Sequence, residues 1–225
     1  MTAVLIIEDE VNLNKILSDY LRHNGFQPVS AHTGKEGLDQ WQTARPSLVL
    51  LDLNLPDMDG LDVARAIRKS TQTPIIMVTA RQEELDCLIG LELGADDYIS
   101  KPFSPREVVA RVKAVLRRCM IQSHGEGIIQ LGAIGIDLEA RTVMLNDTLL
   151  NLTPAEYNLL VQLAGKPGKV FTRSELLQAT QGACYAGYER TIDVHIKNLR
   201  QKIRQIDPDT IYIQTVTGQG YRALG

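Results

Sequence analysis

The stretch LVLLDLNLPDMDG, residues 48–60, decides how the first half of the chain folds. Its four leading apolar residues are typical of a short strand that is buried on both faces of a parallel sheet. The strand ends at Asp52, and residues 60–69 follow with the period of a helix. A strand joined to a helix is the repeating unit of an α/β fold. The stretch therefore predicts a parallel sheet whose central strand ends in a carboxylate.

Three other apolar runs also end at, or just before, a polar residue. VLII (4–7) precedes Glu8 and Asp9, IIMVT (75–79) closes at Thr79, and DDYIS (96–100) precedes Lys101. Helices are expected between the runs and after them, near residues 11–24, 34–43, 60–69, 83–93 and 105–118. The carboxyl ends of parallel strands meet at one crevice, which is where such folds bind ligands. The sequence thus predicts a pocket that gathers three carboxylates, one hydroxyl and one ammonium group.

The chemistry of this pocket follows from its charges. Three carboxylates repel one another unless a cation lies among them, and oxygen ligands of this kind favour Mg2+ or Mn2+ over zinc. We expect Glu8 and Asp9 to hold the metal, and we expect Asp52 to attack phosphorus and form an aspartyl-phosphate. Lys101 and the Thr79 hydroxyl would each contact a phosphoryl oxygen, so that charge on the transferring group is stabilised.

Each of these residues also has a simpler explanation. Asp9 can be a helix N-cap, Thr79 can cap the next helix, and Lys101 can be a solvated loop residue. The pocket is favoured because four such residues at successive strand ends are improbable as unrelated features. Pro102 supports the same interpretation, since a proline favours an extended conformation at the preceding lysine.

The length of 225 residues suits two small domains, which we place at residues 1–118 and 128–225 with a linker at 119–127. No apolar run approaches the roughly 20 residues of a membrane span, and the first residues lack the basic region of a signal peptide. The cysteines are odd in number and widely spaced, at Cys87, Cys119 and Cys184. This pattern disfavours disulfides and zinc sites and fits a reducing cytoplasm.

The second half of the chain predicts a different kind of domain. Residues 128–152 alternate in short pieces between turn signals, which indicates a small antiparallel sheet. TPAE (153–156) has the form of a helix start, and helices are expected to about Ala164, at about 173–180 and at about 188–205. The segments IYIQTV and YRAL around TGQG predict a final hairpin. These elements indicate an α+β domain that is smaller than the first.

The helix expected at 188–205 carries a basic stripe beside an apolar face. The apolar residues at helical spacing are Ile192, Ile196, Leu199 and Ile203, and the bases are Arg190, Lys197, Arg200, Lys202 and Arg204. The net charge of −3 does not exclude nucleic acid, because residues 119–225 carry 10 basic and 10 acidic residues while residues 1–118 carry 14 and 17. Helix-turn-helix proteins place such a helix in the major groove, although a solvated basic face is the commoner explanation of such a stripe.

Residues 1–118 resemble a response-regulator receiver domain. The matching segments are IIEDE (6–10), LLDLNLPDMDGL (50–61), MVTA (77–80), GADDYISKPF (94–103) and AVLRR (114–118). The resemblance implies a doubly wound five-stranded parallel sheet of the CheY-like, flavodoxin-like kind. It also implies Asp52 as phosphoacceptor, Mg2+ held by Glu8, Asp9, Asp52 and the Asn54 carbonyl, Lys101 on the phosphoryl group, and Thr79 and Tyr98 as a switch pair.

Residues 128–225 resemble the winged-helix domain of the OmpR/PhoB family of transcription regulators. The matching segments are LTPAEYNLL (152–160), PGKVFTRSELL (167–177), RTIDVHIKNLRQKI (190–203) and TVTGQGYR (215–222). The resemblance implies binding to double-stranded promoter DNA through Arg190, Thr191, Lys197, Asn198, Arg200, Lys202 and Arg222. Asn198 stands where relatives read a base, and an asparagine suits adenine. Thr217 stands where relatives have a wing arginine, and it cannot reach into a minor groove as arginine does.

The resemblance also implies partners. These are a sensor histidine kinase, RNA polymerase and, after phosphorylation, a second copy of the chain. Family receivers often dimerise through salt bridges between the fourth and fifth helices, and the matching residues are Asp96, Asp97, Glu107, Arg111 and Arg118. Cys87 stands where the basic partner of Glu107 is usual, so one bridge of this seam is expected to be missing.

The expected function is a phosphorylation-switched, DNA-binding transcription regulator, and two other functions remain open. A phosphatase or phosphotransferase that acts through Asp52 generally needs a second acid two residues later, where this chain has Asn54, so we expect no enzyme of this kind. A DNA-binding regulator could also use its receiver only as a phosphorylation-independent dimerisation module. The intact acidic set disfavours that function, and an unaltered dimer constant after phosphodonor treatment would support it.

Overall fold

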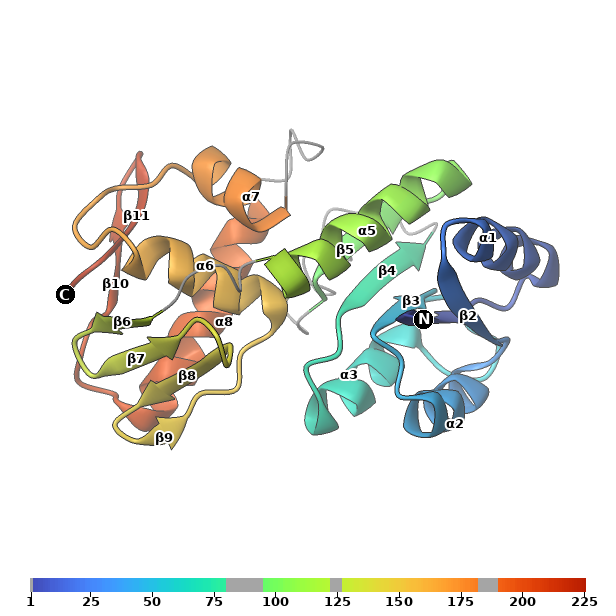
Figure 1. Cartoon of the computed structure of the whole chain (residues 1–225), viewed down its shortest axis with the longest axis horizontal. Coiled ribbons are helices and arrows are strands. Elements are labelled where there is room, and N and C mark those ends of the chain that lie inside the picture. Colours follow the sequence, from blue (N-terminus) through green and yellow to red (C-terminus); the bar gives the residue numbers. More distant parts are fainter. Residues whose placement is uncertain (1, 80–94, 122–126, 182–189) are drawn as a thin grey trace. The chain divides into compact units, whose positions relative to one another are not determined.

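The computed structural model describes residues 2–79, 95–121, 127–181 and 190–225. The chain divides into two compact units, Met1–Leu116 and Arg117–Gly225. Each unit has its own hydrophobic core. In Figure 1 the first unit runs from blue to green and the second from green to red.

A five-stranded parallel sheet forms the centre of unit 1. Its strands are β1 (Thr2–Ile7), β2 (Phe26–Ala31), β3 (Leu48–Leu51), β4 (Ile75–Thr79) and β5 (Asp97–Ser100). They pair in the order β2-β1-β3-β4-β5, with every pair parallel. The chain reverses its direction of travel across the sheet after β2, so the crevice expected of a doubly wound fold lies between β1 and β3. The predicted sheet is confirmed.

Helices cover both faces of this sheet (Figure 1). They are α1 (Val11–His23), α2 (Gly34–Ala44), α3 (Gly60–Ser70) and α5 (Pro105–Ile121), close to the predicted ranges. Apolar residues of α1 and α5 pack with alternate residues of the strands on one face. On the other face α2 contacts β1 so closely that a Cβ added to Gly37 would lie 2.5 Å from Ile7 Cδ1. The helix predicted at 83–93 lies outside the described residues.

The described part of unit 2 contains an antiparallel sheet, three helices and a hairpin. The sheet is formed by β6 (Ile128–Leu131), β7 (Ile134–Asp137), β8 (Thr142–Leu145) and β9 (Thr148–Leu149), paired in that order. The helices are α6 (Pro154–Ala164), α7 (Arg173–Gln181) and α8 (Arg190–Ile206). The hairpin joins β10 (Ile213–Val216) to β11 (Gly220–Ala223). The predicted α+β architecture is therefore confirmed.

Local sequence explains where these helices begin and which face they bury. Thr153 and Glu156 form a capping box at the start of α6, with Pro154 in the first turn. On α8 the predicted apolar stripe is buried, with Ile192, Ile196, Leu199 and Ile203 at most 3% exposed. The polar side of α8 is thereby left toward solvent and toward the neighbouring elements of its own unit.

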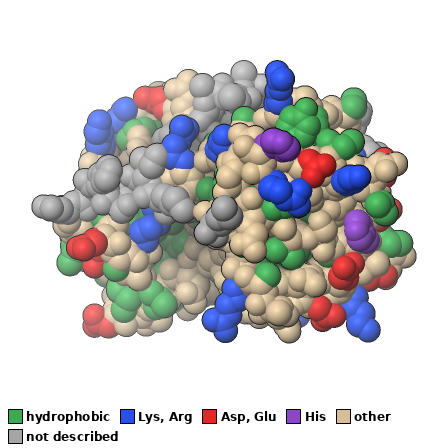
Figure 2. Space-filling view, turned by 45° about the vertical axis from the view of Figure 1, so that its right-hand side comes forward, with side chains coloured by type: hydrophobic (Ala, Val, Ile, Leu, Met, Phe, Trp, Pro, Cys, Tyr) green, Lys and Arg blue, Asp and Glu red, His purple; other side chains and the backbone are tan. Residues whose placement is uncertain are grey.

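Charged side chains are scattered over the face of unit 1 that is turned to the viewer in Figure 2. Acidic, basic and histidine side chains are mixed there with small, separate groups of apolar side chains. Among the helices in the described ranges, none is both long and apolar enough to cross a membrane.

Candidate functional site

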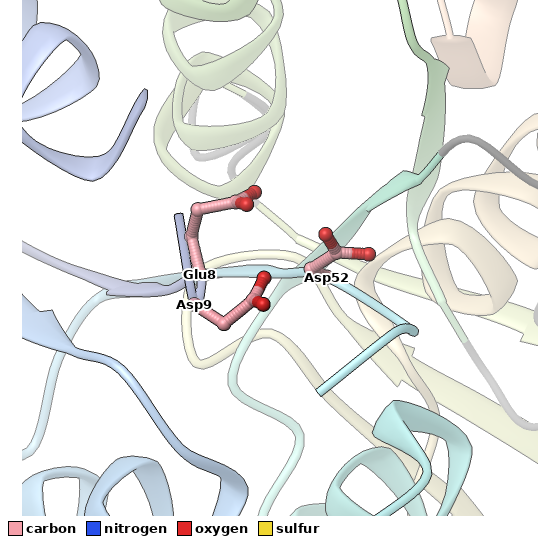
Figure 3. A group of neighbouring side chains, drawn as sticks. All are labelled: Glu8, Asp9 and Asp52. Carbon is pink, nitrogen blue, oxygen red and sulfur yellow. The ribbon is translucent and has the colours of Figure 1, made fainter. Parts of the chain in front are cut away.

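The predicted acidic pocket forms at the carboxyl end of the unit 1 sheet. Ile7 and Leu51 are paired across β1 and β3, so Glu8 and Asp52 follow directly from neighbouring strand ends. Asp9 comes next in the chain after Glu8. One carboxylate oxygen from each of the three residues lies within 4.8 Å of the others, and Figure 3 shows the three carboxylates around one common space.

Lys101, which follows the end of β5, is the cation of this pocket. Its Nζ lies 2.9 and 2.8 Å from the two carboxylate oxygens of Glu8 and 2.7 Å from Asp52 Oδ2. Burial disfavours the charged form of the lysine, but the hydrogen bonds and charges of Asp52 and Glu8 outweigh burial and raise the pKa of Lys101. The lysine is therefore held as an ammonium ion between two carboxylates.

The environment of Glu8 is less favourable to charge than that of an ordinary surface acid. Glu8 is buried, and burial is the main reason why its pKa is raised to about 7. The hydrogen bond from Lys101 lowers the pKa and the charge of Asp52 raises it. A buried carboxyl that lies beside other carboxylates is well suited to receive a second cation.

The simpler explanations of two residues do not hold. The N-cap of α1 is Glu10, and its side chain makes no capping hydrogen bond, so Asp9 is not the cap of that helix. The Lys101 side chain is only 21% exposed and is bonded to two acids, so it is not a solvated loop residue. Both residues belong to the pocket.

The loop after Asp52 is tightly fixed. Asp52 Oδ1 accepts a hydrogen bond of 3.0 Å from the Asn54 backbone N–H, and Asp59 caps α3 by accepting from Leu61 N–H. A Cβ on Gly60 would lie 2.3 Å from the Asp52 carbonyl oxygen, so α3 can begin beside Asp52 only with glycine there. Asp9 and residues 53–59 line a depression at the surface of this loop.

Asp57 makes structural hydrogen bonds that were not predicted from the sequence. Its two carboxylate oxygens accept from the Gly34 and Lys35 backbone N–H groups at 2.7 and 3.0 Å. These hydrogen bonds hold the pKa of Asp57 below its ordinary value. Asp57 thus ties the loop that carries Asn54 to the N-terminus of α2, where a carboxylate also complements the helix dipole.

The residues present fit a hard divalent cation. The donors are carboxylate oxygens of Glu8, Asp9 and Asp52, which is the ligand type that Mg2+ prefers. Asp9 is exposed while the other two are buried, so the cluster opens to solvent on one side. Asn54 lies beside this opening, since Asp9 and Asn54 line the same depression.

The proposed switch residues lie on the strands next to the pocket. Thr79 closes β4 and pairs with Ser100 of β5, but its side chain lies outside the described residues. Tyr98 is buried on β5, two residues from Ser100. Their backbone positions place both residues on strands that end at the pocket.

The residues assigned to a dimer seam mostly have partners within one receiver. Arg111 contacts both Asp97, at 3.4 Å, and Glu107, at 2.7 Å. Cys87 and the side chain of Arg118 lie outside the described residues. The structure thus brings three of the predicted residues together inside a single chain.

Asp96 needs a correction. Its carboxylate is buried, and Oδ2 accepts hydrogen bonds of 2.9 Å from both Arg68 and the Ile75 backbone N–H. A seam on the receiver surface requires an accessible side chain, whereas Asp96 joins α3 to the start of β4. Arg68 was not singled out from the sequence, because nothing in its helical position marks its partner.

Three residues of α8 that were predicted to contact DNA have partners or packing within unit 2. Lys202 lies 2.6 Å from Glu156 Oε2 on α6, and Arg200 donates to the Ile213 carbonyl and to Thr215 on β10. Thr191 is buried. Arg200 and Lys202 are still partly exposed, and contact of these residues with DNA stays a prediction.

Other predicted DNA contacts remain on the surface. Lys197 is exposed on α8, and Asn198 is partly exposed next to it. Arg222 of β11 is bonded to Gln214 across the hairpin, and the side chain of Arg190 lies outside the described residues. The exposed part of α8 is therefore narrower than the sequence suggested.

Comparison with known proteins matches both units. A family model described as the response regulator receiver domain matches residues 4–113, and one described as the C-terminal domain of transcriptional regulatory proteins matches residues 147–223. The transcriptional regulatory protein BaeR of Escherichia coli O6:H1 is 46% identical over 97% of this chain and 91% of its own. The sensory transduction protein RegX3 of Mycolicibacterium smegmatis is 41% identical over the whole of both chains.

Solved structures give the same result. A mutant of RitR superimposes with a TM-score of 0.80 at 30% identity over the whole of both chains. DrrB of Thermotoga maritima, described as an OmpR/PhoB homologue, gives a TM-score of 0.53 at 32% identity, again over both whole chains.

Proposed function

The chain belongs to the response regulators that join a receiver domain to an OmpR/PhoB-type DNA-binding domain and is a DNA-binding transcription regulator, and from this premise we propose that phosphorylation of Asp52 switches it. The observation that carries the proposal is the ion-paired cluster of Asp52, Glu8 and Lys101, with Asp9 at its open side. Asp52 is the carboxylate that follows the strand at the centre of the sheet.

The reaction is a phosphoryl transfer onto this carboxylate. One oxygen of Asp52 forms a bond to phosphorus while the bond from phosphorus to the donor histidine of a sensor kinase breaks, and the histidine nitrogen keeps the electron pair. Lys101 already touches Asp52 at 2.7 Å, so its ammonium is within reach of an oxygen on the transferred group. Asn54 N–H fixes the orientation of the carboxylate.

Glu8, Asp9, Asp52 and the Asn54 carbonyl are the residues that would hold Mg2+ here. A bound Mg2+ supplies positive charge that stabilises the negative charge on the transferring group. The protein's own part is to hold the carboxylates close together and to balance them with Lys101.

Replacement of Asp9 by asparagine should weaken Mg2+ binding at least about tenfold, because a neutral amide replaces one of few charged ligands. Calorimetric titration of Mg2+ into the full chain measures the change. Glu10→Gln is the matched control, since Glu10 is the next residue, is also exposed, and lies outside the cluster. Equal losses in the two variants would contradict a ligand role for Asp9.

The phosphoryl group then changes the assembly of the protein. We propose that Thr79 and Tyr98 shift toward the phosphorylated pocket and favour an active receiver that forms a homodimer. Asp97, Glu107 and Arg111 remain candidates for the seam, because they form one charged network near α5. A dimer would bring two copies of unit 2 to promoter DNA in the cytoplasm, where RNA polymerase is the further partner.

Phosphorylation should tighten both self-association and DNA binding. Treatment of the full chain with Mg2+ and acetyl phosphate is expected to lower the dimer dissociation constant and the dissociation constant for target promoter DNA at least about tenfold, which corresponds to an ordinary coupling energy. Sedimentation and DNA-binding titrations measure these constants, with Asp52→Asn as the unswitched control. Unchanged constants in a fully phosphorylated sample would instead support a receiver that serves only for phosphorylation-independent dimerisation.

A further inference from the structure

A guanidinium group connects the central helix of unit 2 to the hairpin. Arg200 of α8 donates from Nε and Nη2 to the Ile213 carbonyl, at 3.1 and 2.8 Å, and from Nη2 to Thr215 Oγ1 at 2.9 Å. Ile213 is buried. The two parallel N–H groups of one guanidinium satisfy a carbonyl at a place where water has little access.

A second set of contacts connects the same helix to the other hairpin strand. The Tyr221 hydroxyl of β11 donates to Asp193 of α8 at 2.6 Å, and Arg173 at the start of α7 donates to the same carboxylate oxygen at 2.7 Å. The Tyr221 ring has the guanidinium carbons of Arg173 and Arg200 at 5.2 and 5.6 Å from its centroid. Cations at this distance are attracted to the ring face.

A third set of contacts joins the backbone of the hairpin to the segment before α7. Phe171 and Tyr221 exchange two backbone hydrogen bonds, of 2.8 and 3.0 Å. A Cβ on Gly220 would lie 2.0 Å from the Phe171 carbonyl oxygen, and Gly220 has a φ of +150°, so only glycine allows this close contact. The hairpin is thus attached both to α8 and to the segment before α7.

We infer that Arg200, together with the Asp193–Tyr221 pair, is a positioning element. It makes α8 and the β10–β11 hairpin one rigid DNA-binding platform. Arg200 then acts by holding the hairpin, and it is not one of the residues that neutralise DNA phosphates. This inference rests on the proposed binding of DNA through α8. Thr217 at the hairpin tip contributes a short side chain, so the hairpin contributes mainly through its fixed position beside α8.

Amide hydrogen exchange of the full chain without DNA tests whether Arg200 holds the β10–β11 hairpin against α8. In Arg200→Ala the amides of 213–223 should exchange about tenfold faster or more, because hydrogen bonds from a charged group are lost, while α6 and the unit 1 sheet should be unchanged. Thr215→Val removes only one contact and should give a smaller increase in the same amides. Unchanged exchange of the hairpin in a folded Arg200→Ala protein would overturn the inference.

The salt dependence of DNA binding separates positioning from phosphate contact. A random-sequence DNA duplex is titrated at several salt concentrations, and each phosphate contact adds about 0.9 to the slope of log K against log salt. Lys197→Ala, on the exposed side of the same helix, should reduce the slope by about one. Arg200→Ala should weaken binding with the slope unchanged, whereas a reduced slope would show that Arg200 is a phosphate contact. If Lys197→Ala changes neither the affinity nor the salt slope, α8 is not the DNA-binding surface. The exchange rates of residues 213–223 then still decide whether Arg200 holds the hairpin.

Discussion

Replacement of Asp52 by asparagine is expected to abolish phosphorylation of the protein. The amide of asparagine is a far weaker nucleophile than a carboxylate, and the substitution replaces the charged partner that Lys101 has at this position with a neutral one. Incubation of the full chain with Mg2+ and acetyl phosphate, followed by intact-mass measurement, should show an added phosphoryl group in the native protein and none in the variant. Peptide mapping of the native protein should place the group on Asp52.

Asp59→Asn provides the matched control for this result. Asp59 lies seven positions from Asp52 in the same loop and caps α3, and asparagine keeps the capping oxygen. This variant should be phosphorylated at close to the native level. Full phosphorylation of Asp52→Asn, or a phosphoryl group mapped to another residue of the native protein, would refute the assignment.

The second large effect is expected on stability, when Arg68 is replaced by methionine. The Asp96 carboxylate is 3% exposed and the Arg68 side chain 10%, so the substitution removes a guanidinium from an acid that remains buried. It also removes a donor from the Thr73 carbonyl. Breaking a buried ion pair on one side typically costs roughly 3–5 kcal/mol of the free energy of unfolding. We expect a loss in this range for unit 1.

Denaturant titration followed by fluorescence measures this loss. Trp41 is the only tryptophan of the chain and lies on α2, so its signal reports the unfolding of unit 1. Arg65→Met is the control, because Arg65 is three positions away on the same helix and pairs with Asp62 at the surface, where an ion pair contributes about 0–1 kcal/mol. Similar losses in the two variants would show that the Arg68–Asp96 pair is not a buried structural link.

The elements of the acidic pocket could be predicted because strand ends are visible in the sequence. The apolar runs before Glu8, Asp52 and Lys101 are short and continuous, and the topology of parallel sheets brings their carboxyl ends together. The helix ranges were close for a similar reason, since caps such as Thr153 and glycines such as Gly60 stand at their ends. These signals lie within a few residues of the element that they define, so a single sequence is enough to recognise them.

Side-chain partners were harder to predict because they depend on packing between distant segments. Asp57 accepts from the N-terminus of α2, and Arg68 pairs with an acid 28 positions away. Arg200 and Lys202 look like a basic face when only their charge is counted. Whether such a base meets solvent or a neighbouring element depends on where β10 and α6 lie, and the helical period alone does not contain that information.

The pairing of Lys101 with Glu8 also has a consequence for the order in which the molecule forms. The two residues are 93 positions apart, and they follow the first and the fifth strand of the sheet. Closing so long a segment costs chain entropy before the contact contributes, so such contacts form late. During synthesis Glu8 and Asp52, which follow β1 and β3, leave the ribosome well before Lys101, whose charge balances theirs. We therefore expect the like charges of these acids to disfavour the folded sheet in a chain shortened before residue 101, unless another cation binds between them.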